Sequence, residues 1–134
     1  MVHRRYRLMV REYIHKNITG NTATAITRKY DDNNDYDIFS MTLCNTHATD
    51  SVYVDLYLSK LNRNDHFPGK GGDWNEAVDT FTTIYIIKDI EITSNNTLVL
   101  EKEEIEFDTT IYDFYIQLNS ADSTVDLILN KQLN

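Results

Sequence analysis

The sequence predicts an all-β fold: an antiparallel β-sandwich of the Ig-like or jelly-roll kind, with about seven or eight strands and an extended N-terminal arm. Nine Tyr and five Phe, against one Pro and four Gly, are typical of β-structure. Segments of alternating apolar and polar residues recur at intervals of about 10–15 residues, with no convincing helix between them.

Size and charge limit the classes of function. A chain of 134 residues is expected to form one domain with its own core. The net charge of −8 is uneven, because residues 1–30 hold seven of the thirteen basic residues and only one of the twenty-one acidic ones. An acidic body behind a basic leading segment favours self-association or docking on a negative partner, and predicts a body that avoids nucleic acid.

Neither a membrane nor a secretory role is expected. No apolar run reaches the roughly 18 residues of a membrane helix, and the N-terminus lacks the apolar core of a signal peptide. Cys44 is the single cysteine, which rules out a disulfide within the chain and fits assembly in a reducing cytoplasm.

We expect residues 1–17 to form a basic arm or edge strand, and residues 18–134 to form the sandwich. Alternation over residues 5–11 favours an extended arm, although helical spacing also fits residues 6–14. The functional interpretation is an arm that grips an acidic neighbour, and the alternative is an edge strand whose charges block unwanted pairing. The partner-binding candidates on this arm are Arg4, Arg5, Arg7 and Arg11.

The next segment is polar, with a possible short strand over residues 22–27 and a loop over residues 31–35. Asp31, Asn33 and Asp35 have the alternate spacing of a calcium loop. Tyr36 and Thr42, however, stand where such a loop needs Gly and a bidentate Glu. A solvated turn is therefore expected, and no metal site.

Two core strands follow, over residues 37–45 and 51–59. Phe39, Met41 and Leu43 are the expected core set of the first strand. The two strands should pair as an antiparallel hairpin. Clean alternation in the second strand places four residues inward: Val52, Val54, Leu56 and Leu58.

Residues 60–79 interrupt this rhythm as a long loop, which predicts a functional or mobile segment. The glycines that follow Pro68 lack the spacing of a phosphate-binding loop. Trp74 is predicted either to cover the core as a lid or to anchor a neighbouring subunit, and it is the fifth partner-binding candidate.

Residues 82–101 have the pattern of a strand, a turn and a second strand. Ile90 and Ile92 alternate with acidic residues, which predicts one apolar face. At Ile86 and Ile87 the alternation breaks, which predicts either a bulge or a strand buried on both faces.

The last third of the chain begins with an acidic run over residues 101–108, expected to be a solvated face. Strands are expected over residues 109–120 and 124–130, the first with Tyr112, Phe114, Ile116 and Leu118 on one face.

No arrangement of catalytic residues emerges from the sequence. Cys44 and His47 are close in sequence, but two ligands do not make a zinc site. Cys44 lacks the electropositive setting of a nucleophile and is interpreted as a small buried hydrophobic residue. We therefore expect no enzyme and no cofactor.

The order of strands and turns over about residues 36–130 resembles small structural proteins of tailed-bacteriophage virions that have an Ig-like or jelly-roll sandwich. The segments that carry the resemblance are Val52–Leu58, Tyr85–Ile92, Thr97–Leu100, Tyr115–Ser120 and Val125–Leu129. The resemblance implies a virion component: capsid decoration, neck or head-to-tail joint, or tail and baseplate. It carries no catalytic residues.

The leading hypothesis is a non-enzymatic virion subunit, assembled in the host cytoplasm as a homo-oligomer that contacts other subunits of the same particle. The first alternative is a carbohydrate-binding module that offers a glycan the aromatic platform Tyr53, Tyr57, Tyr85 and Trp74. The second is a small hydrolase, which would need a pocket of converging titratable groups.

Overall fold

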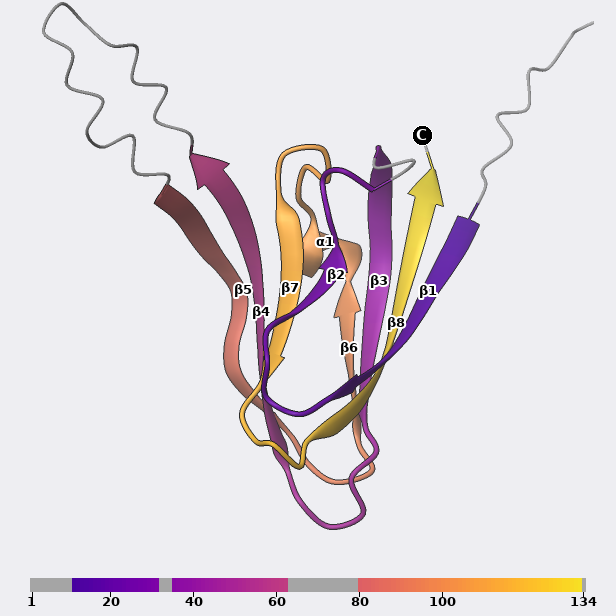
Figure 1. Ribbon diagram of the computed structural model, residues 1–134. Helices are drawn as coiled ribbons and strands as arrows, with labels where there is room; N and C mark the ends of the chain where they lie inside the picture. The colour runs from indigo at the N-terminus through magenta and orange to yellow at the C-terminus, as the bar shows by residue number, and fades with distance from the viewer. Residues whose placement is uncertain (1–10, 32–34, 63–79, 134) are drawn as a thin grey trace, which may run out of the picture.

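A computed structural model describes residues 11–31, 35–62 and 80–133, and it is an antiparallel β-sandwich, as predicted (Figure 1). Eight strands form two four-stranded sheets. The strands are β1 (Arg11–Thr19), β2 (Thr24–Thr27), β3 (Tyr36–Asn45), β4 (Val52–Asn62), β5 (Thr80–Ile92), β6 (Thr97–Glu101), β7 (Asp113–Leu118) and β8 (Thr124–Leu133).

The strand order is β1-β8-β3-β6 in one sheet, here sheet A, and β2-β7-β4-β5 in the other, sheet B. The hairpin predicted for residues 37–45 and 51–59 is therefore wrong, because β3 and β4 lie in different sheets. The strand–turn–strand of residues 82–101 likewise crosses from sheet B to sheet A. Alternation shows only that each strand has one apolar face to bury. The face is buried equally well whether the next strand in the chain pairs with it in the same sheet or lies across the core in the other sheet.

The core lies between the two sheets and is filled by the inward side chains of β3, β4, β7 and β8. The alternation predicted for β4 is confirmed, since Val52, Val54, Leu56 and Leu58 are all buried. The other fully buried large side chains are Met41, Leu43, Ile105, Phe114, Ile116, Leu118, Val125, Leu127 and Leu129. Full burial of such a side chain contributes roughly 1.5–3 kcal/mol.

One predicted core residue is misplaced. The pairing of β3 with β8 shifts between Ile38 and Ser40, so Phe39 is the extra residue of a bulge. Ile38 is buried, whereas Phe39 is half-buried on the outer face of sheet A. A single inserted residue changes which residues face the core: the inward positions after the bulge are out of step with those before it. No residue type in this segment indicates the insertion.

β1 is extended, in agreement with the extended alternative for residues 11–16. It pairs with β8 along its whole length, from Arg11 opposite Gln132 to Thr19 opposite Thr124. The strand continues across the expected boundary between residues 17 and 18, and Ile18 is buried in the core.

The acidic run contains a feature that the sequence did not predict, a one-turn helix α1 (Lys102–Ile105). A capping box starts it: the side chain of Glu101 accepts from the backbone of Glu104, and the backbone N of Glu101 donates to the Glu104 carboxylate at 3.0 Å. Ile105 is 1% exposed and is part of the hydrophobic core. The run is thus a solvated surface with one apolar anchor.

The two sheets lie close together at the end that holds the β3–β4 and β5–β6 connections, and they part toward the opposite end (Figure 1). Asn45 is completely buried at the narrow end. Its side-chain Nδ2 donates to the carbonyls of Asp50 at 2.8 Å and Ile92 at 2.9 Å, and its Oδ1 accepts from the backbone N of His47 at 2.9 Å. Asn45 thereby ties both crossing connections together.

Candidate functional site: the β5 edge and the tyrosine row

β5 is an edge strand of sheet B: among the described residues it pairs with β4 along one side and with no strand along the other. Four of its large side chains are exposed, in contrast to the buried face predicted for it: Phe81 by 67%, Ile84 by 42%, Tyr85 by 47% and Ile90 by 40%. Ile86 and Ile87 are partly buried against the core. Of the predicted apolar pair, Ile92 alone is buried. Exposed aromatic and β-branched side chains on an unpaired edge are typical of a surface that meets another chain.

The break in pattern at Ile86 and Ile87 is a bulge, one of the two alternatives predicted. Tyr57 of β4 pairs with Tyr85 and Leu56 pairs with Ile87, so Ile86 is the extra residue. A second irregularity lies at Asp89, which has a φ of 54° and whose backbone N donates to Asp55 Oδ1 at 2.8 Å. The bulges leave residues 80–85 as the straight part of β5.

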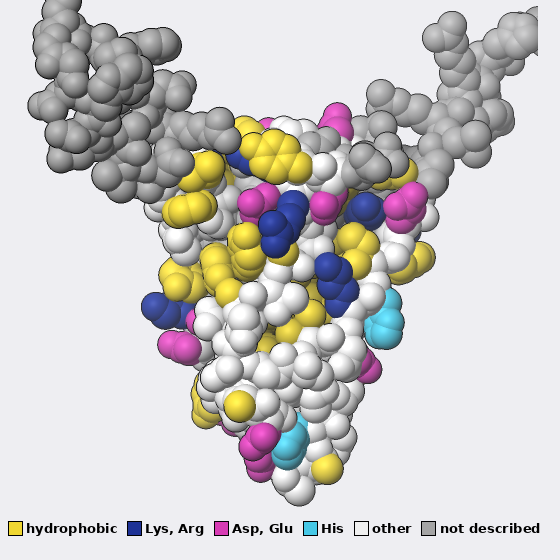
Figure 2. Space-filling view, in the orientation of Figure 1, with side chains coloured by type: hydrophobic (Ala, Val, Ile, Leu, Met, Phe, Trp, Pro, Cys, Tyr) yellow, Lys and Arg dark blue, Asp and Glu magenta, His cyan; other side chains and the backbone are white. Residues whose placement is uncertain are grey.

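Three tyrosines lie in register across the outer face of sheet B. Tyr57 of β4 is directly opposite Tyr115 of β7 on one side and Tyr85 of β5 on the other. We call Tyr115, Tyr57 and Tyr85 the tyrosine row. In Figure 2, hydrophobic side chains gather over the region of β4, β5 and β7, whereas the narrow end is mostly polar.

The rings of the tyrosine row face one another. The Tyr57 and Tyr115 rings are 5.4 Å apart at an interplanar angle of 13°, and the Tyr57 and Tyr85 rings are 5.6 Å apart at 53°. The Tyr57 and Tyr115 rings are nearly parallel, and their centroids are too close for the two rings to lie beside each other in one plane. The two rings are therefore stacked. Lys88 Nζ lies 4.7 Å from the centroid of Tyr85.

This stacking affects both chemistry and recognition. Burial raises the pKa of Tyr57, and the nearby Tyr115, Tyr85 and Asp55 raise it further. The Tyr115 ring stacks on the Tyr57 ring, and the Tyr85 ring is tilted against it, so the three rings do not form one flat surface. A flat platform for a sugar needs the opposite arrangement.

The predicted platform is only partly assembled. Tyr57 and Tyr85 are neighbours, but Tyr53 lies farther along β4, where its hydroxyl donates to Glu91 Oε2 at 3.3 Å. The nearby Glu91 carboxylate raises the pKa of Tyr53. Trp74 lies outside the described residues. Sequence reasoning did not single out Tyr115 or Phe81; strand register alone brings Tyr115 to the row.

Arg11 is the one predicted arm residue within the described part of the chain. Its guanidinium lies over the ring of Phe39, 4.5 Å from the centroid, and Lys102 Nζ approaches the same ring at 5.5 Å. Arg11 thus packs on its own chain. The other candidates, Arg4, Arg5, Arg7 and Trp74, lie outside the described residues.

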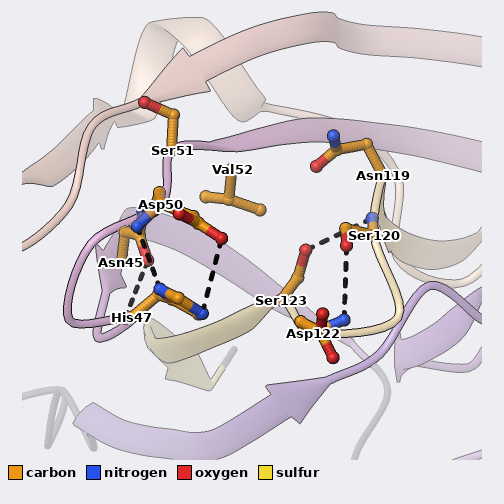
Figure 3. Close-up of a pocket in the computed structure, with 9 residues that line it drawn as sticks. All are labelled: Asn45, His47, Asp50, Ser51, Val52, Asn119, Ser120, Asp122 and Ser123. Carbon is orange, nitrogen blue, oxygen red and sulfur yellow. Dashed lines mark hydrogen bonds and ion pairs between the residues drawn. The ribbon is translucent and has the colours of Figure 1, made fainter.

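A polar pocket of about 280 Å³ lies at the narrow end, between the β3–β4 connection and the β7–β8 turn (Figure 3). His47 Nδ1 accepts from the backbone N of Thr49 at 3.2 Å and of Asp50 at 2.9 Å, and its Nε2 lies 3.8 Å from Asp50 Oδ2. Both ring nitrogens are thus turned to the histidine's own loop. Of the three serines that line the pocket, Ser51 donates its hydroxyl to Glu91 Oε1 at 2.9 Å, whereas the hydroxyl oxygens of Ser120 and Ser123 accept from backbone N atoms of the β7–β8 turn.

The part of the chain that the structure describes has neither a cluster of metal ligands nor a membrane-spanning helix. Within residues 11–31, 35–62 and 80–133, no three His, Cys, Asp or Glu side chains gather as a metal site requires. Cys44 is half-buried on the outer face of sheet A, beside Thr97 of β6 and Asp126 of β8. No helix in the same ranges is both long and apolar enough to cross a membrane.

Comparison with known proteins gives a distant structural likeness. No protein-family model matches the chain, and no curated protein matches it. Among solved structures, a crystal structure of tomato aspermy virus is similar over 92% of this chain and 78% of that one, at 11% identity and a TM-score of 0.36. A likeness at that TM-score carries no argument about function.

Proposed function

We propose that this protein is a non-enzymatic structural subunit of a virus particle that assembles through protein–protein contacts. The observation that carries the assembly role is the β5 edge, where unpaired backbone and exposed apolar side chains coincide over residues 80–85. Monomeric proteins protect such edges, because the unpaired N–H and C=O groups recruit other strands.

The particle itself is assigned by the sequence resemblance over residues 36–130. The antiparallel sandwich is the fold that this resemblance implies. The finer proposal is a component of a tailed-bacteriophage virion, in the neck or head-to-tail joint, the tail, or the capsid decoration, assembled in the host cytoplasm. Arg4, Arg5, Arg7 and Trp74 are proposed as additional contacts to neighbouring subunits.

The geometry favours assembly over the glycan-binding alternative. A sugar ring stacks on a free, flat aromatic face, whereas Tyr57 and Tyr115 stack on each other and the Tyr85 ring is tilted by 53° to Tyr57. A hydrolase has less support still, because the His47 ring nitrogens in the polar pocket are engaged by its own loop.

The test is the solution mass of the full chain, measured by light scattering over a range of concentrations at low and high salt. We expect a mass above the 15.7 kDa of one chain. Contacts through β5 are apolar and should survive high salt, whereas contacts through the arm should weaken. The variant Arg4→Ser, Arg5→Ser, Arg7→Ser tests the arm and leaves the contact of Arg11 with Phe39 in place. A mass of one chain under every condition contradicts the proposal.

A further inference from the structure

Four strands form the edges of the two sheets, and β5 is the one that lacks protection. β2 and β6 are short, at four and five residues. β1 carries Arg11, Glu12, His15 and Lys16 within nine residues. Residues 80–87 of β5 contain no charge, no Gly and no Pro, and they are rich in Thr, Ile and aromatic residues. Such a segment is a strong template for strand addition.

We propose that β5 pairs antiparallel with β5 of a second copy of this chain, about a two-fold axis at Thr83. This inference rests on the proposed function and names the partner at the β5 edge. Strand addition would join two sheets B into one continuous eight-stranded sheet.

The axis follows from the bulges. Residues 80–85 keep continuous register with β4, and the extra residue at Ile86 interrupts it. The centre of the straight segment lies between Thr82 and Thr83, and opposed residues of an antiparallel pair share a face, so the two-fold axis passes through one of these two residues. An axis at Thr83 keeps residues 81–85 in the ladder and sets Phe81 opposite Tyr85 of the second copy. A centre displaced to Ile86 would instead draw both bulges into the ladder.

Charge points to a second copy as the occupant. Each chain has a net charge of −8, so two copies repel each other, and a contact that set further like charges close together would add to that repulsion. The register centred on Thr83 pairs uncharged residues alone and leaves Lys88, Asp89 and Glu91 beyond its end. Two copies of this segment can therefore pair without opposing like charges, although two whole chains repel each other.

The side chains also fit this register. Phe81, Thr83 and Tyr85 share the outer face of sheet B, because their partners on β4 are Leu61, Ser59 and Tyr57. Directly opposed residues place their Cβ atoms about 4.5–5.5 Å apart. The two most exposed aromatic residues of β5 would cover each other, and the tyrosine row would continue into Phe81 of the second copy.

The experiment uses the fact that a residue on a two-fold axis faces itself. Thr83→Lys and Thr83→Glu each set like charges opposite each other, and an equimolar mixture of the two variants sets Lys opposite Glu. The matched controls are Thr97→Lys and Thr97→Glu, on the exposed outer face of the β6 edge in sheet A. Solution mass is measured by light scattering, and circular dichroism verifies the fold of each variant.

We expect the wild type and both Thr97 variants to have twice the mass of one chain. Each Thr83 variant alone should dissociate, with a dissociation constant at least about tenfold higher, because like charges directly opposite destabilise a strand pair. The mixture should regain the doubled mass. A wild-type oligomer that is insensitive to both Thr83 changes overturns the β5 pairing and leaves assembly to another surface. Variants that dissociate but do not recover on mixing overturn the two-fold register, and a monomeric wild type overturns both proposals.

Discussion

β1 and β5 are both long edge strands, one in each sheet, and they differ in where their side chains find partners. On β1, Glu12 lies 3.7 Å from Lys131, Lys16 Nζ donates to the Ala25 carbonyl at 3.1 Å, and Arg11 covers Phe39. On β5, Phe81 and Ile84 remain exposed. Charged side chains of β1 thus find partners within the chain, whereas two large apolar side chains of β5 do not, and we propose that a second copy covers them.

The largest expected effect comes from giving β5 the character of β1. The double variant Phe81→Lys, Tyr85→Lys removes the aromatic contacts of the proposed pair and introduces charge. Two aromatic contacts of about 1 kcal/mol each correspond to at least about a thirtyfold higher dissociation constant. Concentration-dependent light scattering measures the change, and an unchanged mass would count against any role of β5 in assembly.

The reverse exchange should open β1. The triple variant Glu12→Thr, His15→Thr, Lys16→Thr removes the charges that protect this edge, so we expect new association beyond the wild-type oligomer. Sedimentation velocity would resolve the added species. Retention of the wild-type distribution would indicate that these charges do not keep the outer edge of β1 from pairing with another chain.

A third difference concerns how each strand is held to its sheet. Tyr57→Ala removes both ring contacts of the tyrosine row, each of about 0.5–1.5 kcal/mol, so unfolding should become easier by about 2 kcal/mol. Tyr13→Ala on β1 is the matched control, because Tyr13 is 67% exposed. Chemical denaturation of both variants gives the comparison, and equal losses would refute it.

The contact of Arg11 with Phe39 should have a smaller effect. An exposed cation over an aromatic ring contributes about 0.5–1 kcal/mol, so Arg11→Ser should lower the free energy of unfolding by that amount. Arg28→Ser makes the same change of charge elsewhere and serves as the control. Denaturation at low and high salt distinguishes this contact from the overall charge.

The smallest expected effect is on pH dependence. The pKa of Tyr57 is raised in the folded chain, so the folded state keeps its proton at pH values where the unfolded state releases it. Stability should therefore fall as pH rises beyond about 10, the ordinary tyrosine value. Thermal melting across this range should show a shallower fall for Tyr57→Phe, and identical slopes would argue against the raised pKa.

The sequence predicted the strands and much of the core, because alternation such as that of Val52–Leu58 follows directly from the two faces of a strand. It did not predict which strands pair, because β3 and β4 have the same alternation whether they pair in one sheet or face each other across the core. Phe39 was misassigned because a bulge has no residue signature in this segment. The helix α1 was missed because a single turn has no period to detect.

The candidate site was harder to predict than the fold. The sequence indicated that aromatic residues matter, and it named Tyr57 and Tyr85. It missed Tyr115, because only the pairing of β4 with β7 brings that residue beside Tyr57. It also predicted a buried apolar face for the first strand of residues 82–101, because apolar composition does not distinguish a strand that its own chain covers from one whose side chains stay exposed.

The pairing of β1 with β8 has a mechanical consequence. The two strands are antiparallel, and Arg11 is opposite Gln132, so the described segments begin and end at the same wide end of the molecule (Figure 1). A force that separates these two points acts along the interstrand hydrogen bonds and loads them one after another. The sandwich should therefore yield at low force when pulled by residues 11 and 133, by peeling β1 away while β3, β4 and β7 stay packed.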